Sequence, residues 1–303
     1  MGPLTATTEW PPLNDAGAWR TLIAQQNETV MATLAGRAAQ VQVEQSTRIV
    51  NGVSVHVATP LHCDDDRVVL DFHGGALILM GGQACAAMTA IAATGTGLAT
   101  WGVDYRMPPD YPYPCGLDDC LAAYRGLLGE RDPSRIVLSG GSAGGNLAAA
   151  LIVRARDEGL PLPAAVVLGT PEVDLTESGD SFNTNCGVDT VLSTLRVVNE
   201  LYAAGHDLAD PYLSPLFADL TGFPPTILTT GTRDLFLSNT VRMHRALRRV
   251  GVSAELHVLE AAPHGGFLGA APEDAEIAAE VRRFIDQWCP RPDSSALELA
   301  VQR

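Results

Sequence analysis

A serine in a glycine-rich turn is the residue of this sequence best suited to nucleophilic chemistry. Residues 135–145 read RIVLSGGSAGG, a buried strand that runs directly into Gly140-Gly141-Ser142-Ala143-Gly144, and a helical pattern follows at 146–156. This is the strand–GxSxG–helix context of a nucleophile elbow, in which glycines let neighbouring backbone pass close to a strained serine. The pattern therefore predicts Ser142 as a nucleophile at a helix N-terminus, where the helix dipole favours developing negative charge.

The same turn has two other interpretations. One is a glycine-rich turn with an incidental serine, which the turn by itself leaves open. The other is a dinucleotide-binding fingerprint, but GxGxxG requires glycine where Ser142 stands. Ser142 is a nucleophile rather than an incidental serine only if the chain also supplies a base and an acid for it.

Two later loops supply a base and an acid for this serine. The strand expected at 226–230 leads to Asp234, and the strand expected at 254–259 leads to His264. Serine, acid and histidine follow one another in the order typical of hydrolases with such an elbow. His264 is the one of seven histidines with this loop context, so it is the predicted base.

Two points about these partners stay open at this stage. Asp174, which also follows an expected strand, competes with Asp234 for the role of acid, although Asp234 is favoured because it lies one strand before His264. The structural alternatives are a hydrogen-bonded loop histidine and a turn or helix-capping aspartate.

A glycine-rich loop upstream of the serine could stabilise an oxyanion. The strand expected at 68–72 runs into His73-Gly74-Gly75-Ala76. Backbone N–H groups of such a loop, together with that of Ala143, are the donors that a tetrahedral intermediate requires. His73 itself is interpreted as a structural residue that holds this loop by hydrogen bonds.

Apolar runs that alternate with helical patterns indicate how these residues are positioned. Runs suited to buried strands occupy 68–72, 99–103, 135–139, 164–168, 226–230 and 254–259. Residues 47–57 alternate around Asn51-Gly52, which predicts a tight hairpin. Together they predict an α/β fold with a mostly parallel eight-stranded sheet flanked by helices. Functional residues collect at the carboxyl ends of such strands.

Two segments depart from this alternation. Residues 15–42 carry apolar residues at helical spacing, and residues 177–215 are longer than an ordinary connection. We expect residues 1–44 and about 177–215 to form a small helical cap over the strand ends. Residues 45–290 then form the catalytic domain that contains the insertion, and residues 291–303 form a weakly ordered tail.

Composition removes several classes of function. The 303 residues include 20 basic and 35 acidic side chains, which gives a formal net charge of −15. This charge repels phosphate backbones and anionic headgroups, so neither nucleic acid nor a membrane is expected as a partner. Every basic residue is arginine, and without lysine a P-loop site, a pyridoxal Schiff base and a Ser/Lys hydrolase are excluded.

The cysteines and the uncharged segments predict neither a metal site nor a membrane span. The cysteines are too sparse for a disulfide framework and form no CxxC pair, so we expect reduced thiols and no metal. Residues 1–12 do not form a secretory signal, and a cytoplasmic location is the expectation. Residues 74–103 lack charge, but their glycines and threonines divide them into strand, helix and strand.

Several further motifs accompany the elbow and the two loops. They are Asp104-Tyr105-Arg106 with Pro108 and Pro114, Gly145-Asn146-Leu147, Asp174-Leu175-Thr176, Asp210-Pro211 with Ser214-Pro215, and Pro263-His264. With these motifs the sequence, from about Val68 to Trp288, resembles the bacterial hormone-sensitive-lipase-like carboxylesterases of the α/β-hydrolase fold, close to monoterpene ε-lactone hydrolase-like sequences. The resemblance implies a triad of Ser142, Asp234 and His264.

The resemblance also implies where the oxyanion donors and the cap lie. The donors come from Gly75, the position of Ala76, and Ala143, with Gly74 shaping the loop. The family implies a two-part cap, no cofactor, and a homodimer in many members.

Three positions depart from the family pattern. Ala76 replaces a third oxyanion-loop glycine, and Gly141 stands where many members have an acidic residue. Glu172 occupies a position where similar sequences often have tryptophan, which would place a carboxylate near the substrate. The alternative for Glu172 is a solvent-facing or salt-bridged side chain.

The expected activity is the hydrolysis of small to medium carboxylic esters through an acyl-enzyme. Lactone hydrolysis by the same residues is the runner-up, and a non-catalytic binding protein is the alternative of a different class. The predicted substrate pocket is lined by residues that flank the catalytic loops, which are Leu77, Ile78, Glu172, Phe236, Phe267 and Leu268.

Overall fold

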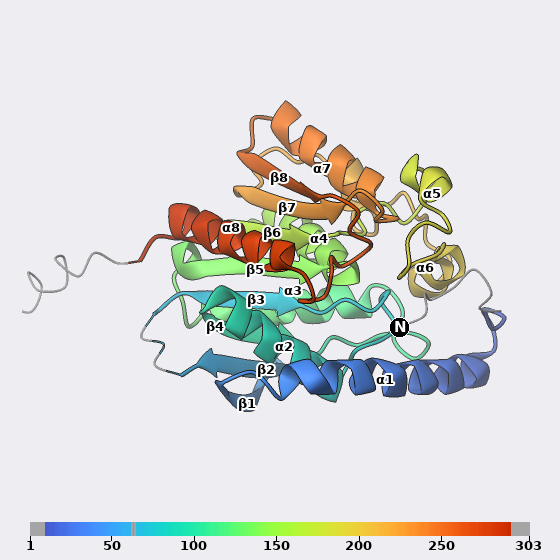
Figure 1. Cartoon of the computed structure of the whole chain (residues 1–303), viewed down its shortest axis with the longest axis horizontal. Coiled ribbons are helices and arrows are strands. Elements are labelled where there is room, and N and C mark those ends of the chain that lie inside the picture. The colour runs from blue at the N-terminus through green and yellow to red at the C-terminus, as the bar shows by residue number, and fades with distance from the viewer. Residues whose placement is uncertain (1–9, 62, 64, 292–303) are drawn as a thin grey trace, which may run out of the picture.

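One eight-stranded sheet forms the centre of the computed structural model, which describes residues 10–61, 63 and 65–291 (Figure 1). The strands are β1 (Val43–Val50), β2 (Val53–Pro60), β3 (Val68–Phe72), β4 (Ala99–Val103), β5 (Ile136–Gly141), β6 (Ala165–Gly169), β7 (Thr226–Gly231) and β8 (Ala254–Leu259). Their order is β1-β2-β4-β3-β5-β6-β7-β8. The pairs β1–β2 and β2–β4 are antiparallel, and the other neighbours are parallel. The predicted mostly parallel sheet is confirmed.

The first two strands form the predicted hairpin. Val50 pairs with Val53 across the turn, and Asn51 and Gly52 have φ values of 48° and 87°. Positive φ at both central residues is what a type I′ turn requires, and asparagine and glycine tolerate it best. The hairpin continues to Val43 and Pro60, beyond the predicted range of 47–57.

Helices cover both faces of the sheet, as the continuous apolar strands require. The helices are α2 (Gln83–Thr96), α3 (Cys115–Leu128), α4 (Ala143–Asp157), α7 (Leu237–Arg249) and α8 (Pro272–Trp288), with short 3-10 turns at Pro133–Arg135 and Pro215–Phe217. In Figure 1, α2 and α8 lie in front of the sheet and α3 and α4 lie behind it. Strand residues alternate between the faces: Val137 lies in one apolar cluster with Phe284 of α8, whereas Leu138 lies in another with residues of α4 such as Leu147.

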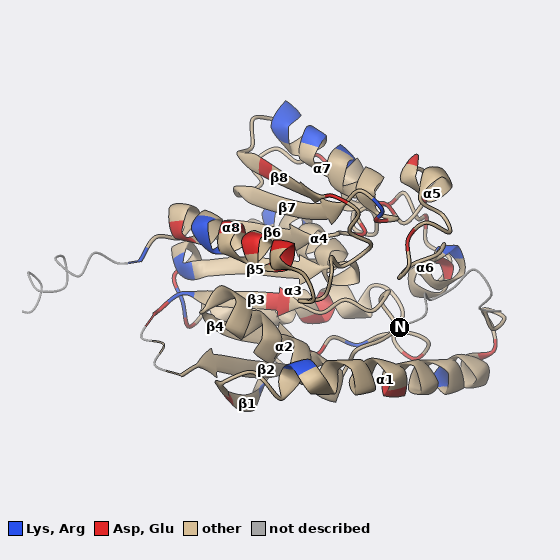
Figure 2. Cartoon of the chain, viewed as in Figure 1, with Lys and Arg blue, Asp and Glu red and all other residues tan. Residues whose placement is uncertain are grey.

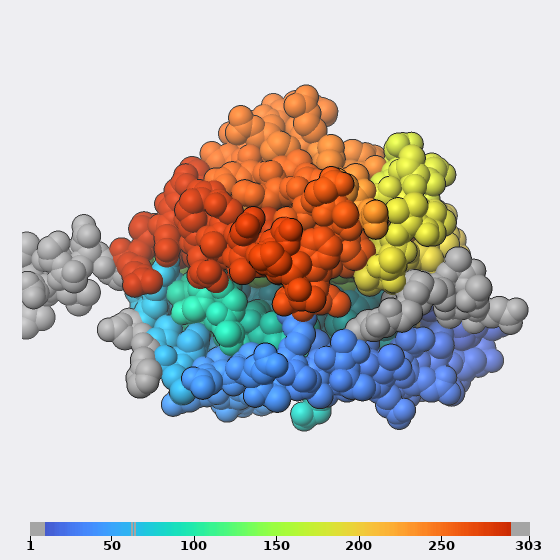
Figure 3. All heavy atoms as spheres, in the orientation of Figure 1, coloured from blue at the N-terminus to red at the C-terminus, as the bar shows by residue number. Residues whose placement is uncertain are grey.

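A separate apolar cluster joins three segments at one end of the sheet. Helix α1 (Ala16–Ala38) contributes the fully buried Trp19, and the loop after β3 contributes Ile78. The 177–215 segment, which contains α5 (Ser181–Thr184) and α6 (Arg196–Ala203), contributes Leu195 and Val198. In the space-filling view the blue surface of α1 and the yellow surface of the insertion lie at the same end of the molecule (Figure 3).

Element ends differ from the predicted ones by a few residues. Helix α1 ends at Ala38 rather than near residue 42, and α4 begins at Ala143 rather than at residue 146. The short α5 has no counterpart in the prediction, because four residues show no periodicity. Residues 1–9 and 292–303, which include nearly all of the predicted tail, lie outside the described residues. The division into cap and catalytic domain stays a prediction.

Charged residues lie mainly outside the strands (Figure 2). Arginines line the outer side of α7, and two of them, Arg248 and Arg249, occupy its last turn, where they complement the helix dipole. All six cysteines are free, and Cys85, Cys120 and Cys289 are buried. Within the described part of the chain, no helix has the length and hydropathy needed to cross a bilayer.

Candidate active site

Ser142 stands between β5 and α4 in a strained backbone conformation. Its φ and ψ are 56° and −122°, which is unusual for a residue with a side chain. Three glycines make the turn feasible. A Cβ at Gly144 would lie 1.8 Å from the carbonyl oxygen of Phe72, and one at Gly140 would lie 2.2 Å from that of Gly144. At Gly145 it would lie 2.7 Å from Pro171. The predicted elbow geometry is therefore present.

A continuous hydrogen-bond chain connects the three residues singled out in the sequence. Ser142 Oγ lies 2.8 Å from His264 Nε2, and His264 Nδ1 lies 2.9 Å from Asp234 Oδ1. Asp234 is fully buried, His264 is 6% exposed and Ser142 is partly exposed. A carboxylate on Nδ1 favours the tautomer whose Nε2 carries a lone pair toward the serine hydroxyl. This arrangement can accept the serine proton.

Asp234 is held in place by its own strand and helix. Its Oδ2 accepts a 2.7 Å hydrogen bond from Thr230 Oγ1, and its Oδ1 accepts the backbone N–H of Phe236 at 2.9 Å. The competing acid Asp174 has other partners, because its Oδ2 pairs with Arg242 Nη1 at 2.7 Å. The fixed geometry of Asp234 orients the imidazole of His264.

The loop after β3 lies directly against the serine turn. A Cβ added to Gly74 would lie 3.2 Å from Gly141 O, and one added to Gly75, at φ 109°, would lie 2.5 Å from Leu79 O. Ala76 also has positive φ, 53°, which explains why glycine is the family's usual residue there. Ala143 begins α4, and first-turn N–H groups have no acceptor within their own helix.

His73 has the structural position that the sequence predicts. Its Nδ1 lies 2.8 Å from the carbonyl oxygen of Gly74, and its ring stacks on Tyr105 at 4.1 Å. The Tyr105 hydroxyl donates to His73 O at 2.8 Å. Burial lowers the pKa of His73 to about 4, so the ring is neutral at neutral pH.

Asp189, in the insertion, bonds to both loops that carry Asp234 and His264, and it was not among the residues singled out from the sequence. Its carboxylate is 4% exposed and accepts the backbone N–H of Leu235 at 2.7 Å and, more weakly, that of His264 at 3.3 Å. Asn185 acts similarly, since its amide donates to Asp234 O at 2.8 Å. An aspartate within a long loop belongs to no sequence pattern, so these contacts can be recognised only in the folded structure.

Glu172 links the serine turn to the insertion. Its backbone N–H donates to Ser142 O at 3.1 Å, and its Oε1 accepts from Asn199 Nδ2 of α6 at 3.0 Å. The side chain is fully buried, so it does not face solvent, and Oε2 is a buried atom without a hydrogen-bond partner. Burial raises the pKa of this carboxyl to about 8, and nearby Glu177 adds to the shift. At neutral pH Glu172 is mostly protonated.

The other predicted pocket residues occupy different environments. The Phe236 ring is fully buried and packs edge-on against His264, with ring centroids 4.8 Å apart. Ile78 is buried in the apolar cluster with Trp19, and Leu77 is buried in the main core. Phe267 is half-buried and Leu268 is 44% exposed. Their roles in a substrate pocket stay predictions.

Comparisons with known proteins identify the family to which this chain belongs. A family model described as alpha/beta hydrolase fold matches residues 69–268. The chain belongs to the α/β-hydrolase family. The matched part of this α/β-hydrolase includes the serine turn and both later loops. A curated relative, an acetyl-hydrolase of Streptomyces hygroscopicus, is 36% identical over 190 residues, which are 62% of this chain and 64% of the relative. The match thus spans less than two thirds of that relative's length.

Solved structures extend the similarity to most of this α/β-hydrolase. The crystal structure of esterase E25 is 39% identical, with a TM-score of 0.85 over 90% of this chain and 86% of that chain. An esterase of the bacterial hormone-sensitive lipase family is 31% identical, with a TM-score of 0.79 over 94% of both chains. The predicted resemblance to the hormone-sensitive-lipase branch is confirmed.

Proposed function

We propose that this protein is a serine carboxylesterase that hydrolyses small to medium carboxylic esters through an acyl-enzyme. The hydrogen-bond chain from Ser142 through His264 to Asp234 carries this proposal. A binding protein has no need for a nucleophile, a base and an acid held at 2.8 and 2.9 Å from one another. The names of the related acetyl-hydrolase and esterases support the same reaction.

In the first half of the reaction the serine is acylated. His264 Nε2 takes the proton of Ser142 Oγ while this oxygen attacks the ester carbonyl carbon. The tetrahedral intermediate then collapses, the C–O bond to the alcohol breaks, and the departing alcohol receives the proton from His264. Asp234 stabilises the imidazolium that exists between these two steps.

In the second half water releases the acid. His264 accepts a proton from water, whose oxygen attacks the acyl carbon, and the proton returns to Ser142 Oγ as the ester bond to serine breaks. In both halves we assign the oxyanion to the backbone N–H groups of Gly75, Ala76 and Ala143. Gly74 lets this loop approach the serine turn, since a Cβ at this position would lie only 3.2 Å from Gly141 O and 3.4 Å from Ser142 Cβ.

A direct experiment combines turnover with labelling of the nucleophile. Purified protein should hydrolyse p-nitrophenyl acetate, and a fluorophosphonate should inactivate it while adding one label per chain. Peptide mass spectrometry should find the label on Ser142. A protein with no hydrolysis of any ester in a panel, or a label on another residue, contradicts the proposal.

The same panel addresses the substrate class. Esters of increasing acyl length and lactones of increasing ring size distinguish an esterase from the lactone hydrolase that the sequence leaves open. We propose that α1 and the 177–215 segment act together as the cap that limits substrate size. Their shared apolar cluster includes Ile78 and Phe236, which flank the loops of the reacting groups.

A further inference from the structure

Three side chains with metal-binding atoms converge beside the oxyanion loop, outside the proposed reaction, and a fourth lies next to one of them. His73 follows β3, Cys85 lies on α2 and Asp104 follows β4, and one potential ligand atom from each lies within 4.8 Å of the other two. His56 on β2 extends the group, with its Nε2 3.6 Å from Asp104 Oδ2. Residues distant in sequence thus bring two imidazoles, a thiol and a carboxylate together.

His73 presents an unused lone pair to this group. The residue is 2% exposed, and its Nδ1 can donate to the carbonyl oxygen of Gly74, which leaves Nε2 without a proton. Nε2 is buried and has no hydrogen-bond partner, a condition that is costly for a nitrogen with a lone pair. A metal-binding histidine has this same arrangement, in which the second ring nitrogen donates to a backbone carbonyl.

His56 and Asp104 each have one atom engaged and one directed to the group. His56 Nδ1 lies 3.1 Å from Thr47 Oγ1, whereas its buried Nε2 has no hydrogen-bond partner. Asp104 Oδ1 accepts the backbone N–H of Gly82 at 2.9 Å, and this leaves Oδ2 on the side of His56. These second contacts fix the orientation of the two side chains.

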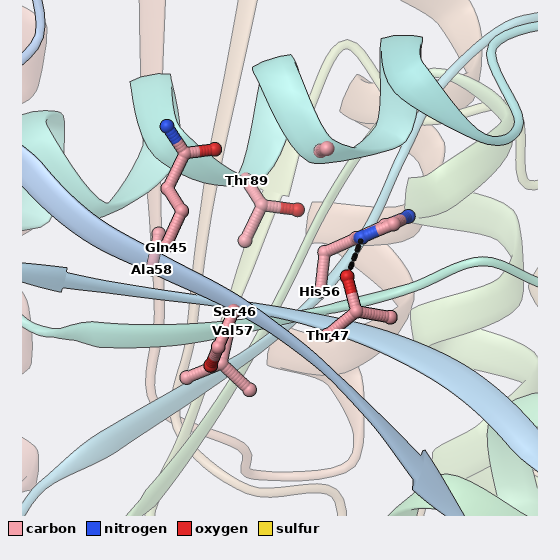
Figure 4. Close-up of a pocket in the computed structure, with 8 residues that line it drawn as sticks. Gln45, Ser46, Thr47, His56, Val57, Ala58 and Thr89 are labelled. Carbon is pink, nitrogen blue, oxygen red and sulfur yellow. Dashed lines mark hydrogen bonds between the residues drawn. The ribbon is translucent and has the colours of Figure 1, made fainter.

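A cavity borders this group at His56. It has a volume of about 130 Å³ and is lined by residues of β1, β2 and α2, including His56 and Thr89. Figure 4 shows one ring nitrogen of His56 bonded to Thr47 and the other pointing away from it. Thr89 lies one helical turn after Cys85 and donates to its carbonyl oxygen at 2.7 Å. The cavity therefore reaches the helix turn that carries the thiol.

We propose that His73, Cys85 and Asp104 form a binding site for one Zn²⁺ or a similar borderline-soft divalent cation, with His56, which lies beside Asp104, as the fourth ligand. A thiolate, two imidazoles and a carboxylate are ligands that zinc accepts in tetrahedral sites, at about 2.3 Å for sulfur and about 2.0 to 2.2 Å for nitrogen and oxygen. Ca²⁺ and Mg²⁺ prefer oxygen ligands and do not suit this set. Donors around zinc lie roughly 3.3 to 3.8 Å apart, closer than the 4.8 Å limit within which the ligand atoms of His73, Cys85 and Asp104 lie, so the side chains move inward when the cation binds.

Charge also favours a cation at this position. Burial, together with the carboxylates of Asp104 and Asp71, raises the pKa of the Cys85 thiol, so the metal-free site holds the protonated thiol beside negative charge. When the cation binds, the sulfur–metal bond replaces the S–H bond and the thiol proton passes to the buffer. The bound cation joins β2, β3, α2 and β4 next to Gly74 and Gly75. It takes no part in ester cleavage, and its site goes beyond the sequence-based expectation of no metal.

The test uses the full chain without an affinity tag, dialysed against EDTA. Isothermal titration with ZnCl₂ should give one equivalent per chain, and binding should raise the Tm. Co²⁺ as a second probe should produce the near-ultraviolet charge-transfer band of a thiolate ligand. Cys85→Ala should abolish this band and weaken Zn²⁺ binding by tenfold or more, while p-nitrophenyl acetate turnover of the metal-free protein is unchanged.

Two variants serve as matched controls. Cys186→Ala removes an exposed cysteine, and His257→Ala disrupts a second group of potential ligands, Glu255, His257 and Glu280. Both should bind Zn²⁺ and Co²⁺ as the unmodified chain does. If Cys85→Ala does not fold, Asp104→Asn replaces it, because the amide oxygen preserves the acceptor for Gly82. The proposal is overturned if no equivalent of Zn²⁺ binds, if the thiolate band is absent, or if His257→Ala removes the binding.

Discussion

At the scale of single residues, backbone strain and burial are concentrated around Ser142. Its left-handed φ of 56° costs free energy that neighbouring contacts must offset, and it directs Oγ to His264. The backbone N–H of Glu172 donates to Ser142 O in this turn, and its side chain accepts a hydrogen bond from Asn199. A substitution of Ser142 therefore tests turnover, and a substitution of Glu172 tests the stability of the fold.

Removal of the serine hydroxyl should abolish turnover and leave the fold intact. In Ser142→Ala the imidazole of His264 has no nucleophile to activate, so kcat should fall by about 10⁶-fold, as for triad knockouts elsewhere. The measurement is p-nitrophenyl acetate hydrolysis together with circular dichroism. A purified variant that retains more than a few percent of the activity would show that another residue is the nucleophile.

The buried Glu172 should make stability depend on pH in a predictable direction. Its folded-state pKa of about 8 exceeds the ordinary value of 4.5, so the folded state holds a proton that the unfolded chain has released. The stabilising contribution is complete below 4.5 and is lost as the pH rises toward and through about 8. Glu172→Gln cannot ionise and retains the acceptor for Asn199, so its free energy of unfolding should fall less with rising pH.

Urea unfolding between about pH 5 and about pH 9 measures this difference. The exposed Glu276→Gln is the control and should follow the unmodified protein. Equal pH slopes for Glu172→Gln and the unmodified protein would show that Glu172 does not titrate in this range.

At the scale of elements, the position of the serine turn depends on how closely α4 approaches β3. The first turn of α4 packs against the end of β3 so tightly that Gly144 leaves no room for a side chain. The Glu172 carboxyl, together with the apolar cluster around Trp19, then connects this layer to α6 and α1. These contacts thus fix the serine turn relative to α1 and α6.

Two neighbouring glycines should differ sharply when replaced by alanine. Gly144→Ala places a Cβ 1.8 Å from Phe72 O, a backbone atom that cannot move aside, so it should destabilise the fold by about 3 kcal/mol or more. Gly141→Ala meets its nearest neighbour, Gly169 O, at an ordinary 3.7 Å and should change stability by less than about 1 kcal/mol. Thermal and urea unfolding test both. Equal losses would refute this account of the elbow.

At the scale of the whole molecule, the reaction and the proposed cation site are independent. The reacting groups lie on the loops after β5, β7 and β8, whereas the ligand group surrounds β2, β3, α2 and β4. The two share only the loop that begins at His73. Ester hydrolysis and metal binding can therefore be measured separately.

Removal of metal should leave ester hydrolysis unchanged. The proposed mechanism uses a serine, a histidine, an aspartate and backbone N–H groups, none of which requires a cation. Turnover of p-nitrophenyl acetate by the same preparation before and after exhaustive dialysis against EDTA checks this expectation. Activity that disappears with the chelator and returns with zinc would contradict the mechanism.

The expected homodimer can be tested by mass. β8 is at one end of the sheet order, and its outer edge pairs with no other strand in residues 10–61, 63 and 65–291. An edge strand is a common place for two copies to associate. Sedimentation equilibrium should give twice the chain mass of 32.0 kDa, and a value of 32.0 kDa at all concentrations would exclude the dimer.

Much of the fold and of the site could be predicted because local physics specifies them. β3, β4 and β8 match the predicted ranges residue for residue, because their short length and the turn residues that flank them favour strands over helices. The Asn51-Gly52 hairpin, the serine turn and the loop positions of Asp234 and His264 follow from equally local patterns.

The sequence by itself determined which residue types are suited to chemistry, the strands that carry them and the turn that holds the serine. Only the tertiary structure decided which distant groups meet. Asp189 bonds to the loops of Asp234 and His264, Glu172 bonds to Asn199, and His73, Cys85 and Asp104 converge, all through contacts between separate elements. The physical reason is that burial and hydrogen bonding across elements depend on packing, whereas turns and strand periodicity depend on neighbours along the chain.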